Sequence, residues 1–341
     1  MKIAIVILNW NGLKHLKEFL PSVVKYSNKN PIYIIDNSST DNSVQFLRQA
    51  FPQINLIINS NNFGYAKGYN EGLKKITEEV YCLLNNDVEV TKGWLDSIIK
   101  EFKNNESVVV AQPKILDYKD KSKFEYAGAA GGFIDYFGYP YCRGRIFNTI
   151  EKDTGQYDQD IDIFWASGAC FFIRKKTFEM LNGFDENFVN HMEEIDLCWR
   201  LANLNIDLKK RFIYKSVIYH YGGGSLDYKN PKKLFYNIRN QRWMILKNMN
   251  VFYGKSLTLF LIQIINFLVL CKYLFNVKIK FFIEILKAMF SNSITVKDDK
   301  INIAKKYEKL RSNKIKSKHY KITSIFYHYF LRSEKKFSDL T

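Results

Sequence analysis

A single carboxylate, Asp87, follows two amides at the end of an apolar run. Residues 80–84 are apolar and predict a strand, which runs into the polar turn Asn85-Asn86-Asp87. In an open α/β sheet, ligands bind at the carboxyl ends of the parallel strands, and Asp87 would lie at such an end. A carboxylate there suits a hard divalent cation that substrate phosphates complete. The alternative is a plain turn, because Asn and Asp are common turn residues.

A second group of acids opens a predicted helix at residues 191–200. Glu193, Glu194 and Asp196 lie in its first turn and Arg200 lies further along, an order that complements the helix dipole. A carboxylate that is partly desolvated is also a good general base, because burial raises its pKa towards working pH. The residues alone leave both roles open.

Polar side chains also follow three other predicted strands, at residues 2–8, 31–35 and 215–219. These side chains are Asn9 and Asn11, then Asp36 and Asp41, and finally His220. Each has an ordinary structural alternative, since an aspartate can cap the next turn and a histidine can simply fill a strand end. Glycines after His220 would let the backbone approach a bound diphosphate.

The order of these elements predicts the fold class. Strands at 2–8, 31–35, 54–58 and 80–84 alternate with stretches of helical periodicity, which indicates an α/β fold with a mostly parallel sheet and right-handed crossovers. The chain has neither a G-x-G-x-x-G turn nor a G-x-x-x-x-G-K-[ST] loop, which argues against a dinucleotide site and a P-loop. Residues 114–163 resemble long substrate-facing loops, and residues 164–173 predict a further strand.

Composition limits the possible partners. The chain has 341 residues, a net charge of +17 and five cysteines without a CxxC pair, which suits a reduced, cytosolic protein that attracts phosphates. The apolar run at residues 1–8 is too short for a signal peptide, so we expect no export. The charge also suggests a nucleic-acid binder, but no recognition module is evident, so we expect no nucleic acid as a partner.

The character of the chain changes near residue 226. We expect a nucleotide-binding and catalytic domain at 1–225 and a helical, basic region at 226–341, with a cluster of lysines between 305 and 318. Residues 256–275 are nearly apolar and borderline for a membrane span of about 20 residues. Contact with an anionic membrane face, a true span and ordinary helix packing all remain open, and we expect a peripheral position at the inner face of the cell membrane.

The motifs form an ordered set that resembles a known family. In chain order they are Asn9-Trp10-Asn11-Gly12, Ile35-Asp36-Asn37-Ser38-Ser39-Thr40-Asp41, Asn62-Phe63-Gly64-Tyr65-Ala66-Lys67-Gly68, Leu84-Asn85-Asn86-Asp87, Trp165-Ala166-Ser167-Gly168-Ala169, Gly183-Phe184-Asp185, Glu193-Glu194-Ile195-Asp196 and His220. Across roughly residues 2 to 248, the sequence resembles the family 2 glycosyltransferases of the GT-A (Rossmann-like) fold, in particular the rhamnosyltransferase-like branch that builds surface polysaccharides. The sheet is then expected to carry a C-terminal helical extension.

The resemblance implies roles for the matching positions. Asp36 matches the aspartate that hydrogen-bonds the nucleotide base, Asp87 matches the last acid of the metal motif, His220 a histidine that joins the metal, and Glu194 the catalytic base. The other residues expected to contact the donor nucleotide are Asn9, Asn11, Asp41, Lys67 and Asn86. Those expected at the donor sugar or acceptor are Trp165, Gly168 and Glu193, although a tryptophan is more often a core residue.

Two departures from the family pattern affect these roles. The metal motif has an amide, Asn85, in place of its first acid, so coordination would rest on Asp87, His220 and the diphosphate. The acid pair reads Glu193-Glu194 where the family has Glu-Asp, which leaves Glu193, Glu194 and Asp196 as alternatives for the base.

The expected function is therefore that of a metal-dependent inverting glycosyltransferase with Mn²⁺ or Mg²⁺. Its donor would be a nucleoside diphosphate sugar of the dTDP or UDP type, and its acceptor a hydroxyl of a saccharide or polyprenyl-linked saccharide. The alternative is a non-catalytic nucleotide-sugar-binding protein of the same fold, in which Asn85 marks lost chemistry.

Overall fold

The computed structural model of the protein describes residues 1–27, 29–126, 128–204, 207–222, 230–249, 252–276, 278–291 and 322–340. Two features expected from the sequence fall outside these ranges. They are the glycines immediately after residue 222 and the lysine cluster at 305–318.

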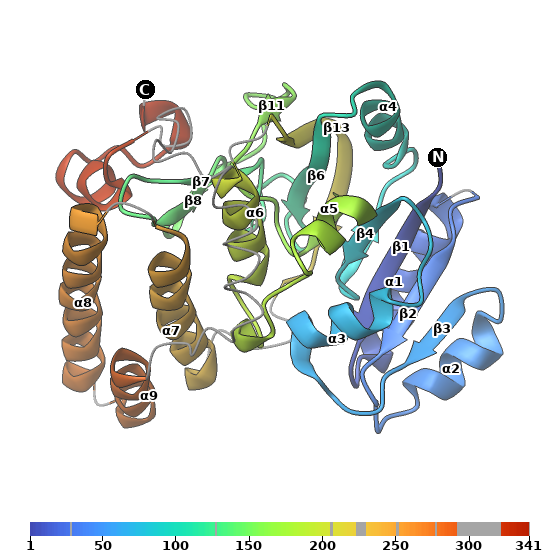
Figure 1. Ribbon diagram of the computed structural model, residues 1–341, viewed down its shortest axis with the longest axis horizontal. Helices are drawn as coiled ribbons and strands as arrows, with labels where there is room; N and C mark the ends of the chain where they lie inside the picture. Colours follow the sequence, from blue (N-terminus) through green and yellow to red (C-terminus); the bar gives the residue numbers. More distant parts are fainter. Residues whose placement is uncertain are drawn as a thin grey trace.

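A large mixed sheet forms the centre of the molecule (Figure 1). Its nine strands pair in the order β11-β13-β6-β12-β4-β1-β2-β3, with β5 added beside β13. The strands are β1 Ile3–Asn9, β2 Ile32–Asp36, β3 Asn55–Ile58, β4 Val80–Leu84, β5 Val88–Val90, β6 Val108–Asp117, β11 Ile161–Asp162, β12 Cys170–Arg174 and β13 Lys209–His220. The neighbours β3, β2, β1 and β4 run parallel, whereas β12 runs antiparallel to both β4 and β6. The predicted α/β class with a mostly parallel sheet is confirmed.

Helices cover both faces of this sheet. They are α1 Leu13–Tyr26, α2 Ser43–Ala50, α3 Gly64–Leu73, α4 Asp96–Asn104, α5 Lys175–Met180 and α6 Glu193–Asn203. Strand β1 shows why the apolar run near the N-terminus has no polar alternation. Ile3, Ile5 and Ile7 enter the hydrophobic cluster that α1, α2 and α4 share, while Ala4 and Val6 enter the cluster of α3, α5 and α6. A strand buried on both faces is apolar throughout.

A second, smaller sheet interrupts the long loops predicted at residues 114–163. Its strands pair in the order β10-β9-β8-β7, where β7 is Gly132–Ile134, β8 Pro140–Cys142, β9 Arg145–Ile146 and β10 Thr149–Ile150. Most of this stretch is loop, as predicted, but the sequence did not reveal its short strands, because strands of two or three residues show no measurable alternation. Gly138 and Gly144 make the intervening turns with positive φ, so the turn chemistry was visible although the strands were not.

The ends of several elements differ from the sequence-based expectation. Strand β6 continues to Asp117 and β13 begins at Lys209, although both stretches contain lysines. These lysines are accommodated because Lys114 lies between Asp153 and Asp158, and Lys210 lies against the ring of Phe164. Strand β12, in contrast, begins only at Cys170, and the residues before it form the loop that carries Gly168.

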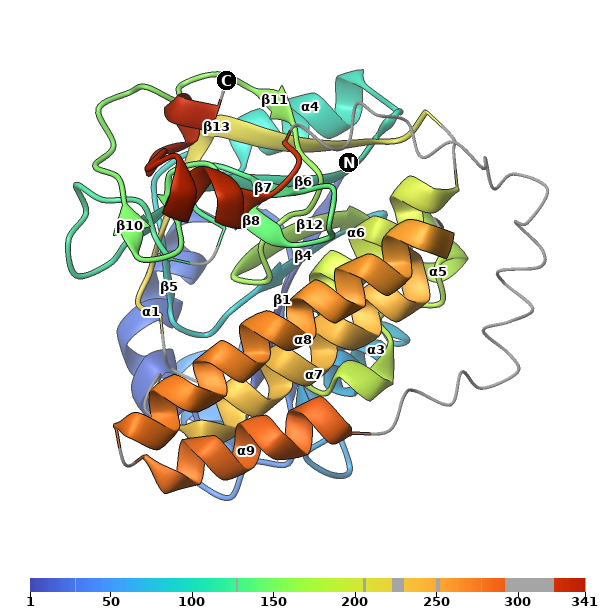
Figure 2. The same cartoon turned by 90° about the vertical axis from the view of Figure 1, so that its left-hand side faces the viewer.

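The C-terminal region is helical, as expected. Helix α7, Pro231–Asn248, lies against α6, and α8, Phe252–Phe275, and α9, Ile279–Phe290, pack on α7 (Figure 2). The stretch Ser256–Phe275 is long and apolar enough to cross a membrane, judged by length and composition alone. The predicted boundary between residues 225 and 226 lies outside the described residues, and the division into two domains stays a prediction.

The final described segment, residues 322–340, returns to the small sheet. The backbone N–H of Ile325 donates to a carboxylate oxygen of Asp135 at 2.9 Å, and the Phe326 ring lies 4.6 Å from that of Tyr139. Ile325 is fully buried in the same hydrophobic cluster as the α/β part of the chain. The segment therefore covers one face of the small sheet, as Figure 2 shows.

Candidate active site

The polar residues singled out in the sequence meet at one edge of the large sheet. Asn9 ends β1 and lies in register with Asp36, which ends β2. Asn85 directly follows β4, which is the other neighbour of β1. His220 ends β13 and is paired with Val88, immediately after Asp87. The carboxyl ends of the parallel strands thus collect these side chains, as the fold class predicts.

Asp36 holds together the part of this edge where a nucleotide is expected. Its Oδ1 accepts from the backbone N–H of Ser39 at 2.8 Å, and its Oδ2 accepts from the Ser39 hydroxyl at 2.7 Å and from Asn9 Nδ2 at 3.1 Å. Asp36 is fully buried, so these bonds fix the loop after β2. Asn86 Nδ2 in turn donates to Asn9 Oδ1 at 3.1 Å, which ties the loops after β1, β2 and β4 together.

Asn11 and Asp41 connect the same loops to the helices that follow them. Asn11 Oδ1 accepts from the backbone N–H groups of Thr40 at 2.7 Å and Asp41 at 3.2 Å. The Asp41 carboxylate accepts from the backbone of Leu13 at 3.1 Å, at the start of α1. Lys67 lies apart from this network, with its ammonium 4.7 Å from the centre of the Phe63 ring. Asn11 and Asp41 therefore shape the edge of the expected nucleotide pocket.

Gly12 explains why the turn after β1 needs a glycine. A Cβ at this position would lie 2.3 Å from Asn9 Oδ1 and 2.4 Å from Asn86 Nδ2. Any side chain would separate the two amides that join β1 to β4.

Asp87 and His220 lie against each other in a buried polar cluster. Asp87 Oδ1 is 3.1 Å from His220 Nε2, and Glu125 Oε1 is 3.2 Å from His220 Nδ1. Burial opposes the charged imidazole, yet the two carboxylates hold the pKa of His220 well above its usual range. Burial likewise opposes the ionised Asp87, but His220 keeps the pKa of that carboxyl below its usual range. Asn85 Nδ2 completes the cluster, 3.3 Å from His220 Nε2.

This cluster fits the protein's share of a divalent metal site. Mg²⁺ binds oxygen ligands at about 2.0–2.1 Å in octahedral geometry, so that two adjacent ligand atoms lie about 3 Å apart. Asp87 Oδ1 and His220 Nε2 have that separation. Glu125 lies on the other ring nitrogen, where a carboxylate usually orients a metal-binding histidine. In the part of the chain that the structure describes, no three His, Cys, Asp or Glu side chains form a complete metal site.

Pairing between β12 and β4 brings a second group of residues to this edge. The backbone N–H of Asn85 donates to the carbonyl of Ala169 at 3.0 Å, which places Gly168 beside the Asn85-Asn86-Asp87 turn. The Tyr65 hydroxyl donates to the Gly168 carbonyl at 3.0 Å. A Cβ built on Gly168 would lie 3.6 Å from Glu194 Oε1, so the acid pair of α6 reaches the loop that adjoins Asp87.

Glu193 and Glu194 differ sharply from ordinary surface acids. Burial raises the pKa of Glu194 to about 7. Burial and the neighbouring Glu194 raise the pKa of Glu193 well above its ordinary range. Among the described residues, Oε2 of each side chain is buried without a hydrogen-bond partner. A buried carboxyl group without a partner is costly to the fold and is typical of functional sites.

Glu194 lies on the wall of a cavity of about 390 Å³. Trp165 forms another part of the wall, and its indole N–H donates to the carbonyl of Phe133 at 2.8 Å, which fixes the ring. Tyrosines from or near the small sheet and apolar residues of α8 form much of the remaining lining, namely Tyr126, Tyr139, Tyr141, Ile262, Ile265 and Val269. Polar and basic side chains line it as well, namely Arg145, His191, Lys233, Asn237, Gln241 and Asn266. A cavity that combines aromatic and apolar walls with a few polar groups suits the binding of a saccharide or an amphiphile.

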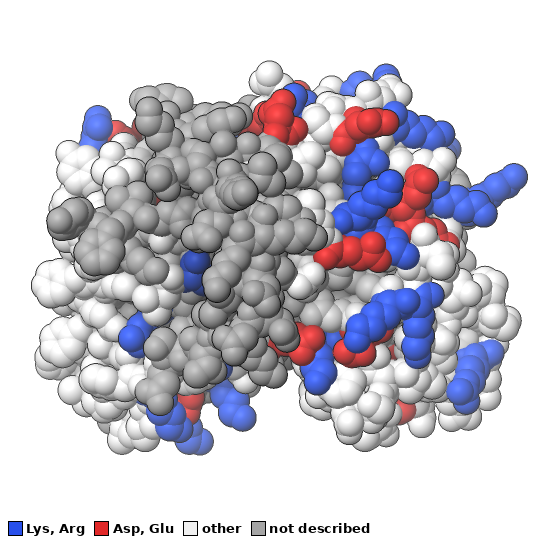
Figure 3. All heavy atoms as spheres, viewed as in Figure 1, with Lys and Arg blue, Asp and Glu red and all other residues white. Residues whose placement is uncertain are grey.

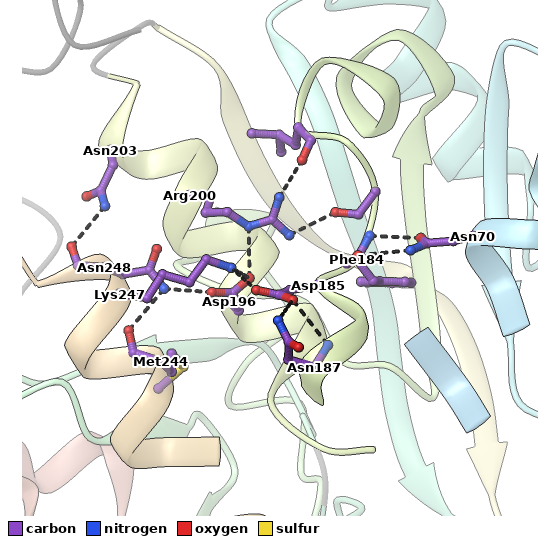
Figure 4. Close-up of polar contacts among 12 residues, drawn as sticks. Asn70, Phe184, Asp185, Asn187, Asp196, Arg200, Asn203, Met244, Lys247 and Asn248 are labelled. Carbon is purple, nitrogen blue, oxygen red and sulfur yellow. Dashed lines mark hydrogen bonds and ion pairs between the residues drawn. The ribbon is translucent and has the colours of Figure 1, made fainter. Parts of the chain in front are cut away.

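Both carboxylate oxygens of Asp196, the third candidate for the base, make structural hydrogen bonds (Figure 4). Its Oδ2 accepts from Arg200 Nε and Lys247 Nζ, both at 2.8 Å, and its Oδ1 accepts from Asn248 Nδ2 at 2.7 Å. Burial alone would raise its pKa, but Lys247 and Arg200 lower it. Lys247 also reaches Asp185 at 2.7 Å, so this network fastens α6 and the preceding loop to α7.

The turn that precedes the acid pair is strained and is clamped by α7. Val189, His191 and Met192 all have positive φ, which is unfavourable for residues with large side chains. The side-chain amide of Asn240, which is fully buried, donates to the carbonyls of Phe188 at 3.2 Å, Asn190 at 2.7 Å and His191 at 2.8 Å. Asn240 therefore fixes the geometry with which α6 presents Glu193 and Glu194.

Three of these contributors were not identified from the sequence. Glu125 lies in a stretch predicted as loop, and nothing in its neighbourhood marked it as a partner of His220. Tyr65 and Asn240 were visible only as members of motifs or helices. Arg239 and Arg242 donate to backbone carbonyls, of Asn187 and Met289 respectively, which are contacts that the sequence did not suggest.

Residues 4–181 match the family described as glycosyl transferase family 2, and the chain belongs to that family. It is 24% identical over 216 residues to the N-acetylglucosaminyl-diphospho-decaprenol L-rhamnosyltransferase of Mycobacterium tuberculosis. The aligned region covers 58% of this chain and 69% of that protein. It is 23% identical over 211 residues to the low-salt glycan biosynthesis hexosyltransferase Agl10 of Haloferax volcanii, covering 60% and 63% of the two chains.

The fold has been seen before in a solved structure. The structure of S. aureus TarS 1-349 in complex with UDP-GlcNAc superposes with a TM-score of 0.50 and 15% identity, over 98% of this chain and 88% of that one. At this identity the likeness shows the fold alone. The GT-A fold and the rhamnosyltransferase-like glycosyltransferase family expected from the sequence are confirmed.

Replacement of Asp196 by Asn should reveal the structural role of this acid. Loss of one partner from a buried ion-pair network is expected to lower the free energy of unfolding by about 3 kcal/mol. Because the folded state holds the pKa of Asp196 below its ordinary value, the contribution is complete above about pH 4 and is lost as the pH falls further. Urea unfolding between neutral and acidic pH measures this. Asp120→Asn, at an exposed ion pair with Lys123, is the matched control and should change little. If the free energy of unfolding of Asp196→Asn differs from that of the wild type by the same amount at every pH, the structural role of the ionised Asp196 is contradicted.

Replacement of Asn240 should loosen the turn before the acid pair. Asn240→Ala leaves three backbone carbonyls without this donor, and Asn240→Asp also adds repulsion, so backbone amides of residues 188–192 should exchange hydrogen faster in both variants. Misplacement by about 1 Å can slow an enzyme about 100-fold, so glycosyl transfer should fall with the exchange. Lys232→Ala, at an exposed site on the same helix, is the control. If Asn240→Asp shows the hydrogen exchange and the glycosyl transfer of the wild type, Asn240 does not fix the turn before the acid pair.

Proposed function

We propose that this glycosyltransferase inverts the anomeric centre of its donor sugar, with Glu194 as the base. The observation that carries this proposal is the state of Glu194. It is a carboxyl group with a pKa of about 7, it has a buried oxygen without a described partner, and it lies on the wall of the cavity beside Gly168. A base is most effective when its pKa is close to the working pH.

In the proposed reaction, one bond forms and one breaks at the anomeric carbon. An acceptor hydroxyl attacks C1 from the side opposite the leaving group while its proton passes to the Glu194 carboxylate. The bond between C1 and the diphosphate oxygen breaks, and the nucleoside diphosphate leaves with the electron pair. The sugar passes through an oxocarbenium-like state, and a single in-line displacement inverts its configuration. Burial and the neighbouring Glu194 raise the pKa of Glu193 well above its ordinary range, which favours its neutral form beside an ionised Glu194.

We propose Asp87 and His220 as the residues that hold a Mn²⁺ or Mg²⁺ ion, with Glu125 orienting the imidazole. When bound, such an ion neutralises the charge that develops on the leaving diphosphate. Asn85 lies within reach of the same group through its side-chain amide. The proposed contacts to the donor nucleotide are Asn9, Asn11, Asp36, Asp41, Lys67 and Asn86.

The proposed donor is a nucleoside diphosphate sugar of the dTDP or UDP type, and the proposed acceptor is a saccharide or polyprenyl-linked saccharide. The M. tuberculosis relative is named for transfer to a decaprenol-linked sugar, which supports a lipid-linked acceptor here. The cavity at Glu194 and Trp165 has an apolar wall from α8, which suits an acceptor with an apolar part. We also propose a cytoplasmic position at the inner face of the cell membrane, which would suit a lipid-linked acceptor.

The pH dependence of transfer tests the role of Glu194. In the wild type, kcat/KM should rise with pH and level off above about pH 7, because only the ionised carboxylate accepts the proton. Glu194→Gln should lower kcat by about 100- to 10,000-fold and abolish this dependence. Glu193→Gln, the matched control, should keep most of the activity because it leaves the proposed proton acceptor in place and because burial favours the neutral form of Glu193. The reverse result would move the base to Glu193, and full activity in both variants would remove the proposal.

Metal binding offers a test that does not depend on turnover. Mn²⁺ should bind the wild type in the presence of a nucleoside diphosphate, as seen by loss of the free-ion signal in electron paramagnetic resonance. Asp87→Ala should weaken this binding, and Glu125→Gln should weaken it by about 10- to 100-fold. Tight, metal-independent binding of a donor without any product, in all variants, would instead favour a non-catalytic nucleotide-sugar-binding protein.

A further inference from the structure

Helix α8 presents a continuous apolar face to the outside of the molecule. Phe260, Phe267 and Leu268 are 63%, 55% and 62% exposed. With Leu257 and Ile264, they recur at intervals of three and four residues and so lie on one side of the helix. The apolar surface continues through Phe275 and Ile279 into the start of α9. Exposed apolar patches of this kind mark interaction sites on a protein surface.

The polarity of α8 is reversed relative to that of an ordinary surface helix. Thr258 and Asn266 lie on its buried side, while its exposed side carries leucine, isoleucine and phenylalanine. A helix at a water interface normally turns charged and polar residues outward. Among the side chains of 256–271 and 273–275, which the structure describes, none is charged. The outward face of α8 is therefore suited to an apolar medium.

The inward side of α8 packs against the rest of the protein. Ile262 and Leu270 are buried, and Ile262, Ile265 and Val269 line the cavity that contains Glu194. A helix that crosses a bilayer alone has lipid on all sides, whereas α8 has α7 and the cavity on one side and an exposed face on the other. This arrangement is that of a helix lying in a membrane interface.

Positive charge accompanies this face. Lys278 and Lys280 are exposed at the start of α9, directly after the apolar stretch, and the chain as a whole carries a net charge of +17. In Figure 3 the described atoms at the left margin, where α8 lies in Figure 1, are mostly white and so belong to uncharged residues. Lysine or arginine atoms lie below them, near α9. Anionic headgroups attract basic residues that flank a membrane-bound segment.

We propose that the outward face of α8, together with Lys278 and Lys280, is a docking surface for an anionic lipid bilayer. In this orientation α8 lies along the interface and separates the lipid from the catalytic cavity by the width of one helix, about 10 Å. The proposal of this docking surface rests only on the exposed apolar side chains of α8 and on the charge of Lys278 and Lys280. Only its link to acceptor delivery rests on the proposed function, because a lipid-linked acceptor would then reach Glu194 past α8.

The test is sedimentation of the full chain with vesicles of phosphatidylcholine, alone or with an equal share of phosphatidylglycerol. The wild type should sediment mainly with the anionic vesicles. The double variant Phe260→Glu/Phe267→Glu should lower the partition coefficient about tenfold or more, because it removes the inserted rings and adds repelling charge. Lys278→Glu/Lys280→Glu should remove the preference for anionic vesicles.

Matched controls separate this effect from general loss of apolar surface or charge. Ile58→Glu/Ile150→Glu changes exposed apolar residues on the two sheets, and Lys2→Glu/Lys92→Glu changes exposed lysines far from α8. Both should sediment with the vesicles as the wild type does. Unchanged thermal unfolding and nucleotide binding show that each variant is folded.

Several results would overturn the docking surface. One is a wild type that stays in the supernatant with both kinds of vesicle, and another is an α8 variant that sediments like the wild type. Retention on vesicles after an alkaline carbonate wash would show that α8 crosses the bilayer. A wild-type dimer that dissociates on Phe260→Glu/Phe267→Glu, without vesicle binding, would assign the face to a second copy. Vesicle binding without any glycosyl transfer would refute the proposed function and leave the docking surface standing.

Discussion

The antiparallel pairing of β12 with β4 is the constraint on which the site depends. Residues on either side of this pairing come from distant parts of the chain, since Cys170 lies opposite Leu84. The bond between Asn85 and Ala169 extends the pairing by one step beyond the strands and brings Gly168 to the metal-motif turn. Glu194 then approaches Gly168 from α6. A parallel sheet alone would collect Asn9, Asp36 and Asp87, but only this inserted antiparallel strand adds the acid pair.

The first turn of α6 shows how position decides the chemistry of similar side chains. Asp196 faces Lys247, Arg200 and Asn248, and its charge is balanced by direct contacts. Glu193 and Glu194 face the interior and the cavity, where burial raises their pKa values. The pKa values of carboxyl groups in one helical turn are thereby driven in opposite directions, which separates a structural anion from the acid that we propose as the proton acceptor.

The sequence predicted those parts of the structure that follow from local periodicity. The apolar run of β1 and the helices that follow β1, β2 and β3 have clear patterns, and the polar residues at the strand ends followed from the rule for open α/β sheets. The small sheet was missed because its strands are too short to alternate. The contact of Glu125 with His220 was missed because it joins a loop to a strand end almost a hundred residues later, which no local pattern reports.

The predicted site residues divide in the same way. The residues alone left structural alternatives open for Asp87, His220 and Glu194, and the resemblance implied their roles; the structure places the first two against each other and the third on a cavity wall. The positions of Glu193, Glu194 and Asp196 depend on Asn240 and Lys247. Both residues lie on α7, and their side chains contact α6 or the turn before it. The environment of an acid depends on such distant partners, so its role is not decided by its place in a motif.

The return of the final described segment to the small sheet has a consequence for how the cavity forms. Ile325 is one of the residues that line the cavity, and it is fastened to Asp135, which lies 190 residues earlier in the chain. Closing a loop of this length costs conformational entropy before the contact is gained, so we expect the contact to form after the more local ones. The proposed nucleotide edge, built from the first ninety residues, would then be in place before Ile325 completes the cavity. A newly made chain would therefore be able to hold the proposed donor before it can enclose the proposed acceptor.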